Sequence, residues 1–111
     1  MIDASAFVIV LTTLPADGDV TTFARTLVDE RLAACVNVLP AMESLYRWQG
    51  AVEQASERQV IMKTSAEKLA DLNARIATLH PYDVPELLVL PIAGGGERYL
   101  KWVRESIAAE K

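Results

Sequence analysis

The chain has 111 residues, of which 51% are apolar and 23% charged, so it is long enough to bury its own core and too apolar to be disordered. Its net charge of −4 comes without any basic cluster, which argues against nucleic-acid partners, and no apolar run approaches the ~20 residues of a membrane span. With no linker-like break and no repeat, residues 1–111 are predicted to form a single domain.

The cysteine count and the first residues bear on the cellular compartment. Cys35 is the only cysteine, so no disulfide can form within the chain, as is usual for proteins of a reducing compartment. Residues 1–6 carry an acid and no basic residue, unlike a secretory signal peptide. We therefore expect a cytoplasmic protein.

The first part of the chain predicts a strand followed by a helix. Phe7 to Leu11 is a continuous apolar run bounded by polar residues and a proline, which predicts a buried strand over residues 6–13. Apolar residues then recur at helical spacing behind two aspartates. This pattern predicts a helix over residues 18–33.

Residues 35–48 and 51–64 predict the two arms of a long hairpin. Gln49-Gly50 between them is a two-residue turn signal, with glycine placed for a positive φ angle. Each arm has 14 residues and spans roughly 45 Å at ~3.3 Å per residue, whereas a helix of about 15 residues spans about 23 Å. The hairpin is therefore expected to project beyond the rest of the domain.

A second helix is predicted over residues 65–79. Thr64 and Glu67 match a capping box, in which the two side chains bond each other's backbone N–H groups. Leucine and isoleucine residues at helical spacing follow. The helix is expected to end at His80, because a residue that precedes proline disfavours helical angles.

The last strand and the last helix are predicted over residues 82–91 and 96–108. Leu87 to Leu90 is a short, fully apolar run that predicts a buried strand, stopped by Pro91. Gly94–Gly96 could cradle a phosphate as a backbone nest, but the Lys-Ser/Thr pair of a P-loop does not follow it. A plain loop is the simpler interpretation.

The order of these elements indicates the fold class. Strand, helix, strand, strand, helix, strand is the split β-α-β-β-α-β pattern, and the last helix is an addition to it. The pattern predicts an α+β sandwich in which a four-stranded antiparallel sheet carries two helices on one face.

Cys35 and His80 are the single thiol and the single imidazole of the chain, and each follows a helix. We expect the fold to bring them to the same side of the sheet, where they could act as nucleophile and base or bind copper or zinc. A buried, unreactive cysteine is the commoner alternative. Metal-binding spacings such as Cys-x-x-Cys are absent, which argues against a closed structural metal site within one chain but leaves open a weak site shared between subunits.

Two further segments of the chain are candidates for a binding surface. HPYDVPE, residues 80–86, holds a histidine, a phenol, two carboxylates and two prolines, which suits either a binding rim or a stiff connection. Tyr46 and Trp48 lie near the hairpin tip, where the chain's own helices cannot cover them. Exposed aromatic side chains of this kind indicate a surface for a partner.

The overhanging hairpin also predicts assembly. A free two-stranded ribbon is marginally stable in water, and its edges expose unpaired backbone groups. A neighbouring subunit can pair its own sheet edge with the overhang. Because that contact joins two different surfaces, it must either close into a ring or grow into a fibre, and a soluble chain favours the ring.

Five short motifs occur in one order along the chain: RLAACVNVLP (Arg31–Pro40), SLYRWQG (Ser44–Gly50), KT (Lys63–Thr64), HPYDVPE (His80–Glu86) and YLKW (Tyr99–Trp102). Together they resemble the CutA family, the divalent-cation tolerance proteins, and the resemblance runs from Phe7 to Trp102. It implies a ferredoxin-like fold, a tight homotrimer, and a cytoplasmic role in bacterial tolerance of copper and other divalent cations.

The resemblance also implies a cleft between subunits. The residues that match the family's cleft positions are Cys35, Tyr46, Trp48, Glu57, Lys63, His80, Tyr82, Glu86, Tyr99 and Trp102. From these we expect a weakly bound divalent cation such as copper, with His80 as the nitrogen ligand and Glu57, Glu86 and Cys35 as the other candidate ligands.

The resemblance brings no firmly assigned reaction, and the sequence offers no clear catalytic constellation. We therefore expect a binding or regulatory protein and not an enzyme. The alternative is a small-molecule sensor or enzyme that uses the cleft around His80, Tyr82 and Glu86.

Overall fold

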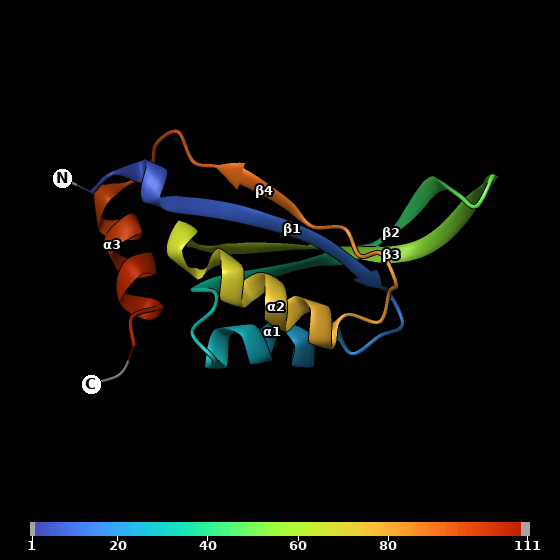
Figure 1. The fold of residues 1–111 in the computed structure, drawn as a ribbon, viewed down its shortest axis with the longest axis horizontal. Coiled ribbons are helices and arrows are strands. Elements are labelled where there is room, and N and C mark those ends of the chain that lie inside the picture. Colours follow the sequence, from blue (N-terminus) through green and yellow to red (C-terminus); the bar gives the residue numbers. More distant parts are fainter. Residues whose placement is uncertain (1, 110–111) are drawn as a thin grey trace.

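A four-stranded antiparallel sheet carries two helices on one face in the computed structural model, which describes residues 2–109 (Figure 1). The strands are β1 (Phe7–Pro15), β2 (Cys35–Trp48), β3 (Ala51–Ser65) and β4 (Leu88–Pro91), in the spatial order β2-β3-β1-β4. The helices are α1 (Val20–Asp29), α2 (Leu69–Leu79) and α3 (Glu97–Ser106), with 3-10 turns at Ala4–Ala6 and Ala66–Lys68. This is the split β-α-β-β-α-β arrangement, so the predicted fold class is confirmed.

Two predicted boundaries are wrong, each for a local reason. The first helix ends at Asp29 and not near residue 33, because Arg31 takes a φ angle of 59°, outside the range of a right-handed helix. The last strand begins at Leu88 and not at residue 82, because its pairing with β1 starts at the Leu11–Leu88 pair. The residues before Leu88 are held by side-chain contacts instead of a strand ladder.

The predicted capping box does not form. Thr64 is fully buried in β3, and its Oγ1 donates a hydrogen bond to the carbonyl oxygen of Leu32 at 2.8 Å. The helix begins only at Leu69, after the 3-10 turn, and no side chain caps it. Thr64 therefore ties β3 to the connection between α1 and β2.

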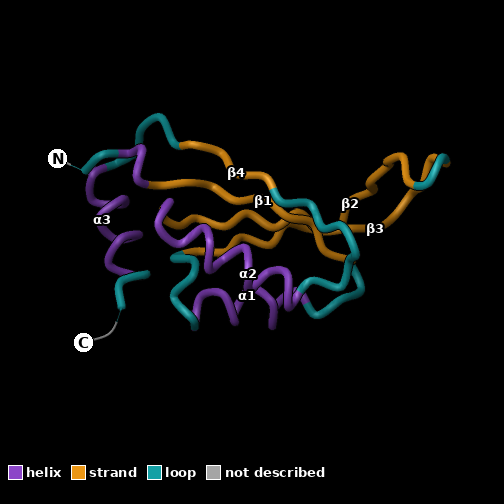
Figure 2. The backbone as a smooth tube through the Cα atoms, viewed as in Figure 1, coloured by secondary structure: helices purple, strands orange, loops and turns teal. Residues whose placement is uncertain are grey.

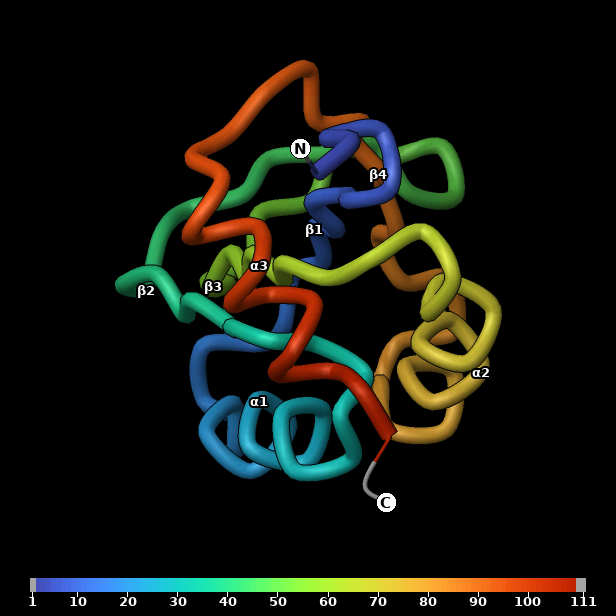
Figure 3. The backbone as a smooth tube through the Cα atoms, turned by 90° about the vertical axis from the view of Figure 1, so that its left-hand side faces the viewer, coloured from blue at the N-terminus to red at the C-terminus, as the bar shows by residue number. Residues whose placement is uncertain are grey.

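The main core lies between the sheet and the two helices. Alternate residues of β1 and β3 face the helices, as Val10 and Met62 do, and they meet Leu27 of α1 and Leu72 of α2. A smaller apolar cluster under α3 closes one end of the sheet, where the end-on view shows α3 in front of the strands (Figure 3). Within residues 2–109, no helix is long and apolar enough to cross a bilayer.

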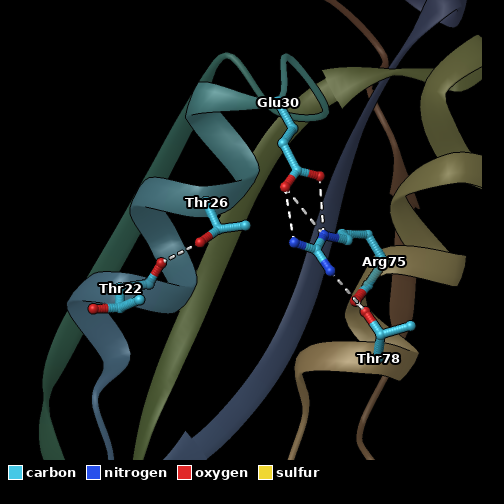
Figure 4. A network of polar contacts seen from close by, with 5 residues as sticks. All are labelled: Thr22, Thr26, Glu30, Arg75 and Thr78. Atoms are coloured by element: carbon cyan, nitrogen blue, oxygen red, sulfur yellow. Dashed lines mark hydrogen bonds and ion pairs between the residues drawn. The ribbon is translucent and has the colours of Figure 1, made fainter.

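A polar clamp joins the two helices on their outer surface (Figure 4). Arg75 of α2 directs its guanidinium at the carboxylate of Glu30, with Nη2 donating to Oε2 at 2.8 Å, while Nη1 donates to Thr78 Oγ1 at 3.1 Å. Both partners of the ion pair are well exposed to solvent. We therefore expect the clamp to contribute below about 1 kcal/mol.

The hairpin of β2 and β3 projects beyond the domain (Figure 2). β3 pairs with β1 as far as the Pro15–Glu57 pair, and the Ser56 carbonyl oxygen still accepts from the N–H of Ala16 at 3.1 Å. Residues 51–55 have β2 as their sole strand partner, and the molecule measures 49 Å along its longest axis. Gln49 and Gly50 have φ angles of 50° and 84°, as a tight hairpin turn of the I′ type requires. The predicted overhang and its turn are confirmed.

The exposure of β4 differs from the sequence prediction. Leu88 is 53% exposed, and Val89 and Leu90 are also well exposed, so the prediction of a buried strand is wrong for the single chain. The reason is topological: β4 lies at the edge of the sheet, where β1 is its only strand partner. An open, apolar sheet edge results.

Candidate functional site

The HPYDVPE segment connects α2 to β4, and His80 fastens it to β1. The side chain of His80 is 8% exposed, and its Nε2 lies 2.7 Å from the carbonyl oxygen of Thr13. Its Nδ1 accepts a hydrogen bond from the backbone N–H of Tyr82 at 3.1 Å. Because a carbonyl can only accept, the proton is on Nε2, and both ring nitrogens are in use.

Tyr82 continues this cluster toward β3. Its hydroxyl donates a hydrogen bond to Oε2 of Glu57 at 2.7 Å, and Glu57 is only 6% exposed. Burial raises the pKa of the Tyr82 phenol well above its ordinary value, and the Glu57 carboxylate raises it further. The hydroxyl is therefore held as a donor, and the buried carboxylate has a hydrogen-bonded partner.

A second contact fastens the other end of the segment. Gln59 of β3 donates from Nε2 both to the carbonyl oxygen of Thr12 at 2.7 Å and to Oε2 of Glu86 at 2.9 Å. The segment is thus held at both ends, with His80 and Tyr82 at one and Glu86 at the other. This geometry favours the binding-rim interpretation, because the polar side chains are held in place by the sheet.

The structure separates the predicted site residues into two groups. His80, Tyr82 and Glu57 meet in one cluster, and Glu86 is anchored to the same strand two residues from Glu57. Asp17 and Tyr46 lie close enough to Tyr82 to raise its pKa a little further, so both are neighbours of this cluster. The remaining predicted residues lie elsewhere: Cys35, Trp48, Lys63, Tyr99 and Trp102.

The expectation that Cys35 and His80 lie on the same side is wrong within one chain. Cys35 is opposite Lys63, which is opposite Ile9, whereas His80 bonds Thr13, four residues further along β1. That separation is about 13 Å along the strand. The reason is that α1 and α2 run in opposite directions, so the residues that follow them lie at opposite ends of the sheet (Figure 1).

Sequence reasoning missed two partners of the cluster, Thr13 and Gln59. Thr13 contributes only its backbone carbonyl, which no side-chain pattern reveals. Gln59 could have been found, because it lies two residues after Glu57 and shares its face of a predicted strand. Nothing in the sequence placed that face opposite residues 80–86.

The residues of a single chain do not fit a metal ion. Among residues 2–109, no three carboxylate, imidazole or thiol side chains come close enough to share one. Both nitrogens of His80 are hydrogen-bonded, so a metal ion there would have to displace one of those bonds. The predicted metal site stays a prediction, and it needs donors from a second chain.

We expect stability to fall as the pH drops through the ordinary range of histidine. Burial lowers the pKa of His80 below its ordinary value of 6.5, although the Thr13 carbonyl and Glu57 oppose the shift. The unfolded chain therefore takes up a proton at a higher pH than the folded chain. The free energy of unfolding should decrease as the pH falls below about 6.5 and level off once the pH is below the folded pKa of His80.

Urea unfolding at pH about 7.5 and about 5.5 measures this effect. Since His80 is the only histidine, His80→Gln is a matched non-titrating control and should lose most of the difference between the two pH values. Equal pH dependence in both proteins would contradict the assignment.

Comparison with known proteins gives consistent matches. A family model described as CutA1 divalent ion tolerance protein matches residues 8–106. The divalent-cation tolerance protein CutA of Thermus thermophilus is 47% identical over 98 residues, covering 88% of this chain and 95% of the relative. A solved structure of the divalent cation tolerance protein from Thermus thermophilus has a TM-score of 0.86 at 46% identity, covering 90% of this chain and 97% of that one. CutA from Synechococcus elongatus has a TM-score of 0.90 at 34% identity, covering 96% and 95%.

A split β-α-β-β-α-β sheet with a projecting hairpin and an added terminal helix defines an α+β protein of the ferredoxin-like class. Within that class, the chain belongs to the CutA1 family of divalent ion tolerance proteins. The resemblance drawn from its five motifs is confirmed.

Proposed function

We propose that this protein acts as a homotrimer in the tolerance of divalent cations, copper among them, as a cytoplasmic binding or regulatory protein. The observation that carries the proposal is the combination of family membership with the unpartnered surfaces of the single chain. The relatives bear the name divalent-cation tolerance protein, which supports the role in metal tolerance.

Three exposed features support assembly. The hairpin overhang leaves residues 51–55 with one strand partner, Trp48 at its tip is 41% exposed, and β4 offers a free apolar edge. Each of these features exposes groups that a neighbouring copy can cover. A contact between the hairpin overhang of one copy and the sheet edge of another is heterologous, because it joins two different surfaces. The number three comes from the family resemblance.

A non-catalytic role is supported by the arrangement of Cys35 and His80. They lie at opposite ends of the sheet within one chain, and neither nitrogen of His80 is free to act as a base while its two hydrogen bonds persist. The alternative, a small-molecule sensor or enzyme at the cleft, is favoured by a different observation. Glu57, Tyr82 and Glu86 form a polar rim that is already in place.

Calorimetric titration with copper tests the metal proposal. We expect weak binding, with a dissociation constant above about 1 μM, because a single imidazole with oxygen partners cannot build a tight site for a soft metal. His80→Ala should weaken copper binding further. Cys35→Ser shows whether the thiolate of Cys35 also contributes to the binding.

Tighter copper binding that survives His80→Ala would contradict this site. No response to metals, combined with stabilisation by a metabolite in a thermal-shift screen, would favour the sensor or enzyme.

A further inference from the structure

The ladder between β2 and β3 contains one β-bulge. Two residues of β2, Leu39 and Pro40, oppose a single residue of β3, Gln59. The two-residue turn fixes the register at the tip of the hairpin, and the core fixes the register in the body of the sheet. These two registers differ by one residue, and the bulge takes up the difference.

A side chain from the opposite strand holds the bulge. Arg58 of β3 donates from Nε to the carbonyl oxygen of Leu39 at 2.8 Å, in a half-buried position. A hydrogen bond from a charged guanidinium is stronger than one between neutral groups. Pro40 has no N–H, so this position of the bulge has no donor that needs a partner. The irregular backbone is therefore fixed by specific residues.

The bulge lies close to the point where the hairpin leaves the body of the sheet. Gln59, the residue opposite it, pairs with Thr13, two residues before the ladder with β1 ends. Beyond this point the ribbon turns away from α1 and α2, toward the open face of the sheet (Figures 1 and 2). Because a bulge bends its strand, it accounts for this turn. We call Leu39, Pro40 and Arg58 the elbow.

The bend is toward the face that carries the polar cluster. Odd-numbered residues of β3, Glu57 among them, face away from the helices, since even-numbered ones such as Met62 fill the core. Tyr46 and Trp48 pair with odd-numbered residues of β3, so they lie on the same face as Glu57 and on the inner side of the bend. The effect of Tyr46 on the pKa of Tyr82 agrees with this placement.

We infer that the elbow aims the overhang, bringing Tyr46 to the Tyr82–Glu57 cluster and presenting Trp48 to a neighbouring subunit. Arg58 is then a positioning residue of the candidate site, acting through the backbone of β2. The placement of Tyr46 depends on the single chain alone. The presentation of Trp48 rests on the proposed trimer, so the two consequences are tested separately.

Deletion of Pro40 tests the bend itself. With one residue fewer, Leu39 can pair with Gln59, and every residue of the tip keeps its partner and its face. Pro40→Ala keeps the extra residue and is the matched control. We expect the deletion to straighten the ribbon and move Tyr46 away from Tyr82, and we expect Pro40→Ala to leave both in place.

The readout is the NMR signals of the Tyr82 ring in protein with labelled tyrosine. Tyr46→Leu removes one aromatic neighbour and should shift these signals in the unmodified protein. The same substitution should have no effect on them after deletion of Pro40, and its full effect in Pro40→Ala. Light scattering gives the mass of each protein. A single-chain mass for the unmodified protein would contradict the trimer and leave the test of the bend intact.

Arginine variants test the residue that holds the elbow. Arg58→Met keeps the apolar stem and removes the donor to Leu39, so it should reduce the effect of Tyr46→Leu on Tyr82. Arg58→Lys should restore part of it, because an ammonium can donate one bond to the same carbonyl. Arg25→Met removes an equal charge from an exposed position of α1 and should change nothing.

A full effect of Tyr46→Leu on Tyr82 after deletion of Pro40 would overturn the inference, as would equal losses in Arg58→Met and Arg25→Met. Loss in the deletion and in Arg58→Met, with retention in Pro40→Ala and Arg25→Met, supports it. If the deletion prevents folding, the comparison of Arg58→Met with Arg58→Lys and Arg25→Met decides the question.

Discussion

Trp48→Glu is expected to convert the assembled protein into single chains and to lower its melting temperature. In one chain the indole is 41% exposed on a ribbon that the helices do not reach, and in the proposed trimer it is covered by a neighbour. A glutamate in that contact would be an unpaired charge in a dry interface, and aromatic anchors of this kind carry much of an interface's stability. Light scattering at low protein concentration should change from a mass near three chains to a mass near one.

Val28→Glu is the matched control for this experiment. Val28 is also 41% exposed, but it lies on α1, which packs on the body of the sheet and not on the overhang. The substitution places the same charge at the same exposure and should leave the mass unchanged. If the Trp48 variant keeps the mass and melting temperature of the unmodified protein, the tip of the hairpin is not in the interface.

His80→Ala is expected to destabilise each subunit by about 2–4 kcal/mol. The change removes the hydrogen bond to Thr13 and the acceptor for the N–H of Tyr82, and it leaves a cavity where the ring now lies edge-on to Phe23. A loss of this size is a large part of the stability of an ordinary domain. Urea unfolding measures it, and hydrogen exchange should show faster opening of residues 81–87 than of β1.

His80→Asn separates the two contacts. An asparagine oxygen can accept from the N–H two residues later, as Nδ1 of His80 does, but the shorter side chain cannot reach the Thr13 carbonyl. Its loss of stability should therefore lie between that of the unmodified protein and that of His80→Ala. Equal losses in the two variants would show that the bond to Tyr82 contributes nothing.

The segment around residues 80–86 shows where sequence reasoning succeeds and where it stops. The two prolines and the density of polar groups identified it as a candidate binding rim, because such local rigidity depends only on neighbours in the chain. Its partners Gln59 and Glu57 are more than twenty residues away. No local pattern states which face of β3 the segment will meet.

Local patterns in the chain were enough to predict the elements, their order and the overhang of the hairpin. Those follow from periodicity, from the Gln49-Gly50 turn and from the different rise of strands and helices, all of which are local properties. Long-range packing, in contrast, made Thr64 bond Leu32 instead of capping a helix, and it left β4 as an exposed edge. It also set Cys35 and His80 apart, because the relative direction of two helices depends on how every strand between them pairs.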